Sequence, residues 1–262
     1  MGGHRGLMRK NLIVMGLFVG LLGTTPVRSA PEETAPALVK RVVKENQFTV
    51  TRGLKDYQDF FGASFRKDLQ SLRGSDHWLD GGAGNAYAQK DFLGSRDGKR
   101  ILADRPKMTA VSLVYPADEP LSLAQGRFRM LAGRYFEEIP IGELEKADLI
   151  TDVTGILNYT EQLDWVLERY LNLLQPNGKI YVFIPRHITR IRTARGAELS
   201  LVQWLKTISG LQITEIKDQR VPYPSDQSFI IERVASNVKV PKLKLLSARK
   251  QVAVFREFTE IE

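Results

Sequence analysis

Short apolar runs alternate with amphipathic helical segments between residues 54 and 235, and this alternation limits the possible folds more than any other feature of the chain. The apolar runs are HWLDGG (77–82), TAVSLVYP (109–116), RFRMLAG (127–133), KADLITDVT (146–154) and KIYVFIP (179–185). The last run is almost continuously apolar, which is typical of a strand buried on both faces. Right-handed crossovers between such strands place helices on both faces of one sheet. The sequence therefore predicts an α/β fold with a doubly wound, mostly parallel sheet.

Three helical segments and two more strand-like runs complete this expected fold. Apolar residues spaced by three or four positions predict a helix over 54–72, with its buried face at Leu54, Tyr57, Phe61, Phe65, Leu69 and Leu72. A second helix is expected over 163–174, with Thr160 as its N-cap and PNG (176–178) as the turn after it. A third helix from Leu201 stops at Gly210, and the strand-like runs LQITEIKD and SFIIERVA follow.

The N-terminal segment MRKNLIVMGLFVGLLGTTPVRSAPEE (8–33) has the three parts of a secretory signal. A basic start at Arg9 and Lys10 precedes an apolar run, and VRS at 27–29 fits a cleavage site. The apolar run is about half the roughly 20 residues that a spanning helix requires, so no stable membrane span is expected. A retained N-terminal anchor stays open as the alternative. In either case we expect the rest of the chain to be exported, to the periplasm or the exterior.

This reading divides the chain into four parts. They are a signal peptide at 1–29, a linker and N-terminal extension at 30–53, a main domain at 54–238, and a C-terminal tail at 239–262. The tail is first basic and then acidic, and its pattern assigns it no structure.

Composition excludes several kinds of site. The chain has no cysteine, which excludes disulfides, thiolate catalysis and cysteine-bound metals. After the signal only His77 and His187 remain, so a histidine-rich metal site is excluded and no metal is expected, although a site built from carboxylates stays open. Removing the signal takes four basic residues and no acid, which lowers the formal charge from +8 to +4. This mild excess of positive charge argues against nucleic acid as a partner. The chain is expected to be a monomer.

The stretch DHWLDGGAGNAYAQKDF (76–92) leads from a strand into a helix through a glycine-rich turn. Glycine permits positive φ and close approach of a ligand to the backbone, while N–H groups at a helix start can bind a polar or anionic group. Tyr87 stands where a dinucleotide fingerprint needs its third glycine, and the phosphate-loop pattern is absent too. The spacing is instead D-x-G-x-G-x-A, from Asp80 through Gly82 and Gly84 to Ala86. By itself this turn fits either a cofactor site or a structural bend.

This spacing resembles the first motif of the class I S-adenosylmethionine-dependent methyltransferases. The block from Asp148 to Pro185 resembles the fourth strand, helix and fifth strand of that family, with Asp152 at the strand end. Residues 198–235 match the helix and antiparallel hairpin with which the family ends. The resemblance covers residues 54–235 and implies a Rossmann-like methyltransferase fold, S-adenosylmethionine as cofactor, and methyl transfer to an unknown substrate.

The resemblance also implies which residues form the site. The cofactor-binding residues would be Asp80, Gly81, Gly82, Ala83 and Gly84 at the methionine end, Tyr115 or Asp118 on the ribose side, Arg134 and Tyr135 on the adenine side, and Asp152 at the border with the acceptor. The substrate residues would be Asn158, Arg186, His187 and Arg190, and the basic stretch after the fifth strand suits an acidic or phosphorylated substrate. No catalytic residue is assigned, because the cofactor is already activated and the protein mainly aligns the reactants.

Two departures from the family pattern leave a second function open. Tyr115 and Pro116 stand at the tip of the second strand, where the family usually has an acid for the ribose, and Arg134 stands where an acid approaches the adenine. The alternative is a non-catalytic secreted or envelope protein that uses the fold as a binding scaffold. Structural alternatives also stay open for single residues: Asp80 as a cap, Asp152 as a solvated strand end, Tyr135 as core, and His187 in a solvated loop, while His77 is expected to be structural.

Overall fold

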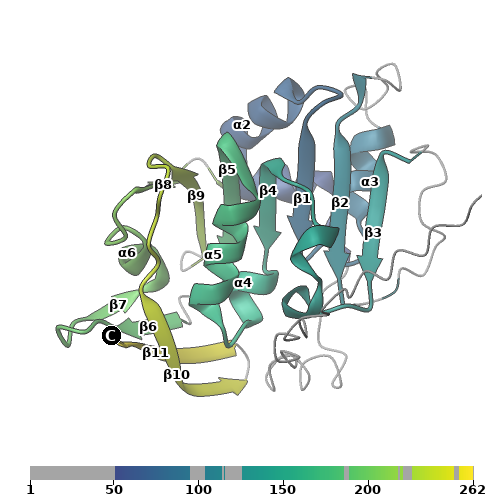
Figure 1. The fold of residues 1–262 in the computed structure, drawn as a ribbon. Coiled ribbons are helices and arrows are strands. Elements are labelled where there is room, and N and C mark those ends of the chain that lie inside the picture. The colour runs from purple at the N-terminus through teal and green to yellow at the C-terminus, as the bar shows by residue number, and fades with distance from the viewer. Residues whose placement is uncertain are drawn as a thin grey trace, which may run out of the picture. The chain divides into compact units, whose positions relative to one another are not determined.

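The computed structural model describes residues 51–94, 104–113, 115, 126–185, 189–217, 219–220, 226–250 and 254–261. Its central feature is a seven-stranded sheet in the order β3-β2-β1-β4-β5-β9-β8 (Figure 1). The strands are β1 (His77–Gly81), β2 (Lys107–Ser112), β3 (Phe128–Ala132), β4 (Ala147–Val153), β5 (Leu174–Ile184), β8 (Leu211–Glu215) and β9 (Gln227–Arg233). β1 to β5 are parallel, whereas β9 runs antiparallel to β5 and β8 antiparallel to β9. The predicted fold class is therefore confirmed.

Helices cover both faces of this sheet. They are α2 (Leu54–Ser71), α3 (Tyr87–Gly94), the 3-10 turns η3 (Phe136–Glu138) and η4 (Ile141–Glu143), α4 (Ile156–Tyr159), α5 (Leu163–Leu173) and α6 (Leu201–Leu205). The side chains of β5 alternate between two buried clusters: Ile180 and Val182 belong to the cluster that contains α5. Tyr181 and Phe183 belong to the cluster that contains α2. Burial on both faces thus explains the almost continuous apolar sequence of β5.

The helix predicted over 54–72 is α2, but it has a kink at Gly62. Gly62 has φ 66° and ψ −154°, a combination that is essentially restricted to glycine. At the kink the backbone N–H of Arg220 donates a hydrogen bond to the carbonyl oxygen of Asp59, at 2.6 Å. A segment from far along the chain therefore docks where the helix bends.

Two local predictions on either side of α5 are wrong. The N-cap of α5 is Gln162 and not Thr160, although the Thr160 hydroxyl oxygen accepts a hydrogen bond from the Gln162 N–H at 3.0 Å. The PNG sequence at 176–178 lies within β5, where the pairing with β4 shifts its register. Asn177 has φ 64°, so these residues form an irregularity in the strand and not a turn between elements.

A second sheet, in the order β10-β11-β6-β7, is built from segments that the sequence did not assign to strands. β6 (Thr189–Arg192) and β7 (Glu198–Ser200) follow β5, while β10 (Lys242–Lys250) and β11 (Val254–Ile261) come from the C-terminal tail. β11 pairs in parallel with β6 and antiparallel with β10. Ile191 and Phe258 are buried here, so residues 189–192 of the basic stretch form a packed strand and not a solvated loop.

The expected signal at 1–29 and most of the expected extension at 30–53 lie outside the described residues. Within the part of the chain that the structure describes, no helix has both the length and the apolar character that crossing a bilayer requires. The boundaries expected for the main domain, 54 and 238, stay predictions.

Candidate functional site

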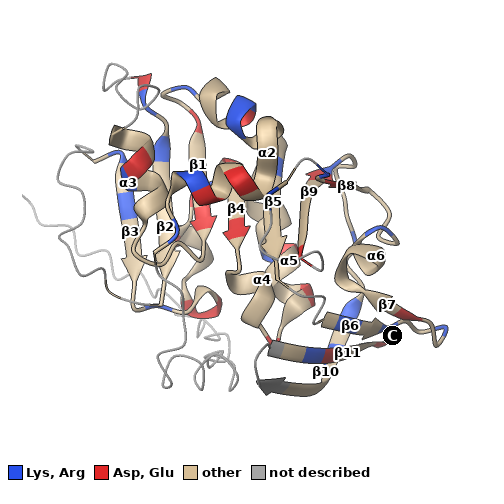
Figure 2. Cartoon of the chain, turned by 180° about the vertical axis from the view of Figure 1, so that it is seen from behind, with Lys and Arg blue, Asp and Glu red and all other residues tan. Residues whose placement is uncertain are grey.

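The strand order reverses between β1 and β4, and this reversal marks where a ligand is expected. From β1 the chain adds β2 and β3 on one side, and it then returns to add β4 and β5 on the other. In open α/β sheets, ligands bind outside the carboxyl ends of the strands at such a switch point. Figure 2 shows acidic residues near the tips of β1 and β4, where Asp80 and Asp152 lie. We call the ends of β1 to β4 and the turns that follow them the carboxyl edge.

The turn after β1 has the backbone that its glycines predict. Gly82, Gly84 and Ala86 have φ values of 143°, 56° and 55°. A Cβ atom on Gly82 would lie 2.5 Å from the Cα of Gly155, in the turn after β4. The N–H of Ala83 donates to a carbonyl oxygen of β2 at 3.0 Å. The turns after β1 and β4 are therefore in close contact, and this contact requires glycine at 82 whether or not a ligand binds.

Asp80, near the end of β1, is completely buried and lies at the centre of a side-chain network. Its Oδ2 accepts hydrogen bonds from the Tyr57 hydroxyl of α2, at 2.7 Å, and from Gln89 Nε2 of α3, at 2.8 Å. Its Oδ1 accepts from the Thr151 hydroxyl of β4 at 2.9 Å. Burial raises the pKa of Asp80, and the three hydrogen bonds oppose this effect. Asp80 therefore joins three other elements to β1 and does more than cap its own turn.

Asp152, near the end of β4, is also completely buried, but most of its partners lie in its own turn. Its Oδ1 accepts from the Gly155 N–H at 3.0 Å, and its Oδ2 accepts from the Leu157 N–H at 3.0 Å and the Tyr170 hydroxyl at 2.8 Å. Burial raises the pKa of Asp152 to about 7, and the negative charge of Asp80 acts in the same direction. The alternative of a solvated strand end is excluded. Asp152 instead fixes the turn that leads into α4.

The partners of both aspartates were not predicted from the sequence. Two of them are tyrosines on the buried faces of predicted helices, Tyr57 and Tyr170. A buried tyrosine hydroxyl needs a hydrogen-bond partner, and this requirement was the signal that could have pointed to them. Tyr170 also explains Gly81, because a Cβ atom there would overlap the Tyr170 hydroxyl. Gly81 and Gly82 are thus both closely packed by the chain itself.

The exposed Tyr115 packs against Gly133 at the ends of β2 and β3. Tyr115 is 77% exposed, and a Cβ atom on Gly133 would lie 2.5 Å from the nearest atoms of the Tyr115 ring. Gly133 also has φ 67°, so both space and backbone conformation require glycine there. The ring therefore packs on the backbone and leaves a flat aromatic surface at the carboxyl edge. Asp118, the other residue predicted for this side, lies outside the described residues.

Arg134 and Tyr135 follow β3, and the charge of Arg134 is paired. Its guanidinium makes two hydrogen bonds to the Glu143 carboxylate, at 2.6 and 3.1 Å. Arg129 reaches the same carboxylate at 3.3 Å. Tyr135 is half-buried next to Phe136, which is fully buried. Glu143 is thus an acid near this end of β3 that the sequence analysis did not consider.

The structure describes two of the four residues predicted for the substrate. Asn158 lies in α4, where it is buried and hydrogen-bonds the Tyr159 side chain. Arg190 is exposed on β6. Arg186 and His187 lie outside the described residues. The assignment of all four to a substrate stays a prediction.

His77 is structural, as predicted. Its ring nitrogens lie 2.9 Å from the Lys146 carbonyl oxygen and 2.9 Å from the Thr109 hydroxyl. Burial lowers the pKa of His77, which keeps the ring neutral between these partners.

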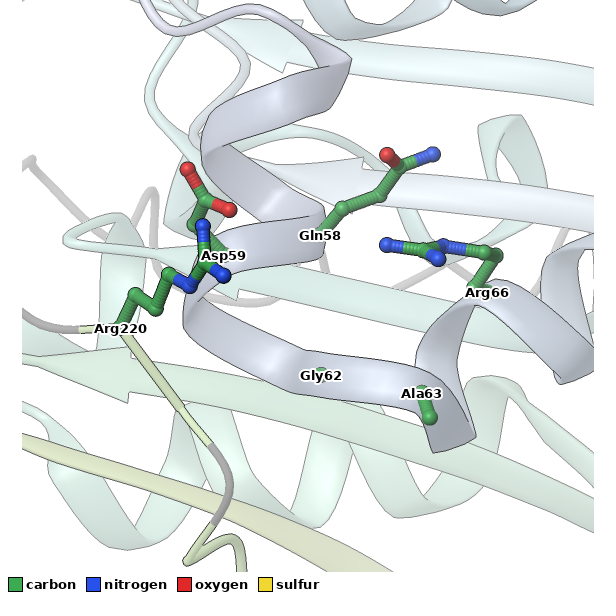
Figure 3. Close-up of a pocket in the computed structure, with 6 residues that line it drawn as sticks. All are labelled: Gln58, Asp59, Gly62, Ala63, Arg66 and Arg220. Carbon is green, nitrogen blue, oxygen red and sulfur yellow. The ribbon is translucent and has the colours of Figure 1, made fainter.

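A separate hollow of about 240 Å³ lies at the kink of α2 (Figure 3). It is lined by Gln58, Asp59, Gly62, Ala63, Arg66 and Arg220. Figure 3 shows Arg66 and Arg220 reaching toward it from opposite sides. None of the residues predicted for the cofactor or the substrate lines this hollow, so we treat it as distinct from the carboxyl edge.

The strand order, with its antiparallel hairpin at one end, defines a Rossmann-like methyltransferase fold. Similar solved structures include an S-adenosylmethionine-dependent methyltransferase from Clostridium acetobutylicum, with 13% identity, a TM-score of 0.42, and 75% of this chain and 97% of that chain covered. A methyltransferase from Pyrococcus furiosus has 19% identity, a TM-score of 0.36, and coverages of 64% and 80%. No protein-family model and no curated protein matches the chain. At such identities and TM-scores these structures say nothing of the activity of this chain, and we base its function on its own residues.

Proposed function

We propose that this chain binds S-adenosylmethionine at the carboxyl edge and transfers its methyl group to an acceptor. The observation that carries the proposal is the turn after β1, which stands at the switch point and has left-handed φ values at Gly84 and Ala86. Packing against Gly155 explains why residue 82 is a glycine. It does not explain why a glycine-rich turn lies at the edge of the sheet where ligands of this fold class bind.

The side chains beneath the turn suit the ammonium group of an amino-acid ligand. An aspartate carboxylate has about four lone-pair positions when it is ionised, and Asp80 accepts three hydrogen bonds within the protein. Its partner Gln89 has a buried Oε1 with no hydrogen-bond partner among the described residues. Both groups are acceptors, and acceptors are what a positively charged nitrogen requires. Asp80 and Gln89 are therefore the residues that would hold the methionine end.

The exposed ring of Tyr115 suits the other end of the cofactor. It lies at the ends of β2 and β3, close to the backbone of Gly133. An exposed aromatic ring provides a stacking surface for a flat ring of a ligand. Tyr115 would therefore contact the nucleoside side, with Tyr135 on the neighbouring turn.

The cofactor supplies a methyl group that its sulfonium sulfur has already activated. The protein then has to bind, to orient and to exclude water, and these are the roles that the described residues can fill. Asp80 and Tyr115 fix the two ends, while Asp152 holds the turn that borders the acceptor. Asp152 is buried and accepts hydrogen bonds from Gly155, Leu157 and Tyr170, so its role is to hold this turn in place.

Calorimetric titration of S-adenosylmethionine and S-adenosylhomocysteine into the full chain tests the proposal. We expect binding tighter than about 100 µM, which corresponds to roughly 5.5 kcal/mol. Gly84→Asn should weaken it at least about tenfold, because asparagine tolerates left-handed φ while its side chain blocks close approach to the backbone. Gly196→Asn is the matched control, since Gly196 has φ 83° and nothing lies within 4 Å of its added Cβ. No heat at millimolar ligand would leave the scaffold alternative as the better explanation of the fold.

The acceptor and the location of the protein are further proposals. The exposed Arg190 on β6 supports an acidic or phosphorylated acceptor. Methylation assays that compare anionic with neutral acceptors would test this preference.

The signal-like residues 1–29 support export, and mass spectrometry of the protein from intact cells should find an N-terminus at Ala30. A chain that keeps residues 1–29 in the cytoplasmic fraction would contradict export and leave cofactor binding unaffected.

A further inference from the structure

The short helix α4 is held at both ends by buried charged side chains. At its start, Asp152 accepts hydrogen bonds from the N–H groups of Gly155 and Leu157. At its end, Arg256 donates to the carbonyl oxygens of Leu157, at 2.6 Å, and of Thr160. Arg256 lies on β11 in the C-terminal tail, 99 positions after Leu157. A carboxylate on the N–H end and a cation on the carbonyl end both satisfy backbone groups that a helix end leaves open.

Arg256 is a costly residue to bury. Its side chain is 1% exposed, and burial lowers its pKa to about 10. Among the described residues it donates to two carbonyl oxygens and to the Thr189 hydroxyl, at 2.7 Å, but to no carboxylate, and its Nε has no partner. Hydrogen bonds to neutral oxygens return only part of the cost of burying a charge. A gain in stability therefore does not account for the burial of Arg256. The segments that its hydrogen bonds hold in place account for it better.

We propose that Arg256 is a positioning residue of the carboxyl edge, which makes the C-terminal tail a working part of the candidate site. Arg256 ties α4 to β11 and, through Thr189, to β6. The turn into α4 contains Gly155, which packs against Gly82 in the glycine turn. A displacement of α4 therefore displaces both turns of the carboxyl edge. The effect on ligand binding rests on the proposed function, whereas the effect on α4 does not.

Arg256 also acts on Asp152 through its charge. The two groups attract each other across α4, so the positive charge favours the ionised form of Asp152. Among the described residues, other titratable groups that act on Asp152 include Asp80 from β1, Tyr57 from α2, Tyr159 from α4 and Tyr170 from α5. Removing the positive charge moves the pKa of Asp152 above its value of about 7, whereas Arg256→Lys keeps the charge.

The test compares Arg256→Met, Arg256→Lys and Arg169→Met in the full chain, by hydrogen exchange of backbone amides. Arg169 of α5 is the matched control because it too is a buried arginine that donates to backbone carbonyl oxygens, those of Phe136 and Ile139. Methionine keeps much of the side-chain volume while it removes the charge and the donors.

We expect Arg256→Met to speed the exchange of the Asn158 and Thr160 amides, which are hydrogen-bonded within α4, by about tenfold or more. Arg169→Met should speed exchange around 136–139 and leave α4 unchanged. Arg256→Lys should give a smaller increase, because it keeps the charge and loses the forked set of donors. Equal increases in α4 for Arg256→Met and Arg169→Met, or no increase for Arg256→Met, would overturn the proposal. If the methionine variants do not fold, Arg256→Lys against Arg169→Lys decides the question in the same way.

Two more readouts separate positioning from general loss of stability. The midpoint of the pH dependence of unfolding between pH 4 and 8 should shift upward in Arg256→Met and stay in place in Arg256→Lys. Arg169→Met does not serve as the control for this readout, because Arg169 lowers the pKa of the buried Glu137. An unshifted midpoint in Arg256→Met overturns the electrostatic role. S-adenosylhomocysteine should bind about tenfold more weakly to Arg256→Met and equally well to Arg192→Gln, an exposed arginine of β6. If the unchanged chain does not bind this ligand, the proposed function fails, and the exchange experiment still decides the role of Arg256.

Discussion

The ends of β1 and β4 both carry a buried aspartate, yet the two carboxylates are held in different ways. Asp80 accepts hydrogen bonds from side chains of α2, α3 and β4. Asp152 accepts from two backbone N–H groups of its own turn and from one hydroxyl. The end of β1 is thus a cross-link between elements, whereas the end of β4 is a loop whose shape depends on one carboxylate. The carboxyl edge thus combines a strand end that is cross-linked to its neighbours, at Asp80, with a turn whose shape depends mainly on the Asp152 carboxylate.

The largest effect is expected from the Asp152 carboxyl at the end of β4, on the pH dependence of the free energy of unfolding. The folded-state pKa of Asp152, about 7, lies above its ordinary value of 3.8, so the folded chain keeps a proton that the unfolded chain loses. The free energy of unfolding should therefore fall as the pH rises from about 4 to about 7, by up to about 4 kcal/mol from this group. Asp152→Asn should lack this fall, which denaturant titrations at several pH values would measure. Parallel pH curves for the two chains would contradict the account.

The contact between the two turns predicts the next largest effect. A Cβ atom on Gly155 would overlap the carbonyl oxygen of Gly81 and lie 2.9 Å from Asp152 Oδ1. Because backbone atoms cannot easily move aside, Gly155→Ala should lower the free energy of unfolding by about 3 kcal/mol. Gly142→Ala is the control, since nothing lies within 4 Å of its added Cβ, and it should change stability by less than about 0.5 kcal/mol. Similar stabilities for the two variants would show that the turns are not in contact.

Two tyrosine variants each remove one hydrogen-bond donor from one of the two aspartates. Tyr57→Phe removes one donor from Asp80, and Tyr170→Phe removes one donor from Asp152. Each should cost about 2 kcal/mol in unfolding free energy, because the lost hydrogen bond is to a buried carboxylate. Tyr170→Phe should also raise the pKa of Asp152, since the Tyr170 hydrogen bond lowers it, whereas Tyr57→Phe should raise the pKa of Asp80 and leave the pH midpoint that Asp152 sets in place. If both variants shifted the midpoint equally, the two ends would form one coupled unit and the contrast would fail.

The smallest effect on stability is expected at Tyr115. Because its side chain is 77% exposed, Tyr115→Ala should change the free energy of unfolding by less than about 0.5 kcal/mol. It should nevertheless weaken S-adenosylhomocysteine binding at least about tenfold, because the stacking surface at the end of β2 is lost. Thermal melts and titrations on the same sample measure both. Unchanged affinity would remove Tyr115 from the site.

The seven-stranded sheet could be predicted because each parallel strand is a short, dense apolar run, and KIYVFI in β5 is buried on both faces. The second sheet was not predicted, although TRIR in β6 and KLKLL in β10 alternate polar and apolar residues as half-buried strands do, because these runs pair with strands that are distant in the sequence. Arg256 and Thr189, for example, are 67 positions apart. The glycine turn and Asp80 were found from their spacing. Their partners Tyr57 and Tyr170 were not, since a tyrosine on the buried face of a helix indicates that its hydroxyl needs a hydrogen-bond partner but not which residue that partner is.

A cofactor site at the carboxyl edge is tested by mapping where the ligand binds. Hydrogen exchange of the full chain would be measured with and without saturating S-adenosylhomocysteine. We expect slower exchange in residues 80–86 and 152–158, the turns after β1 and β4, with Tyr115 and Gly133 at the border of the protected region. Unchanged exchange in both turns, or protection confined to the hollow lined by Arg66 and Arg220, would contradict a cofactor site at the carboxyl edge.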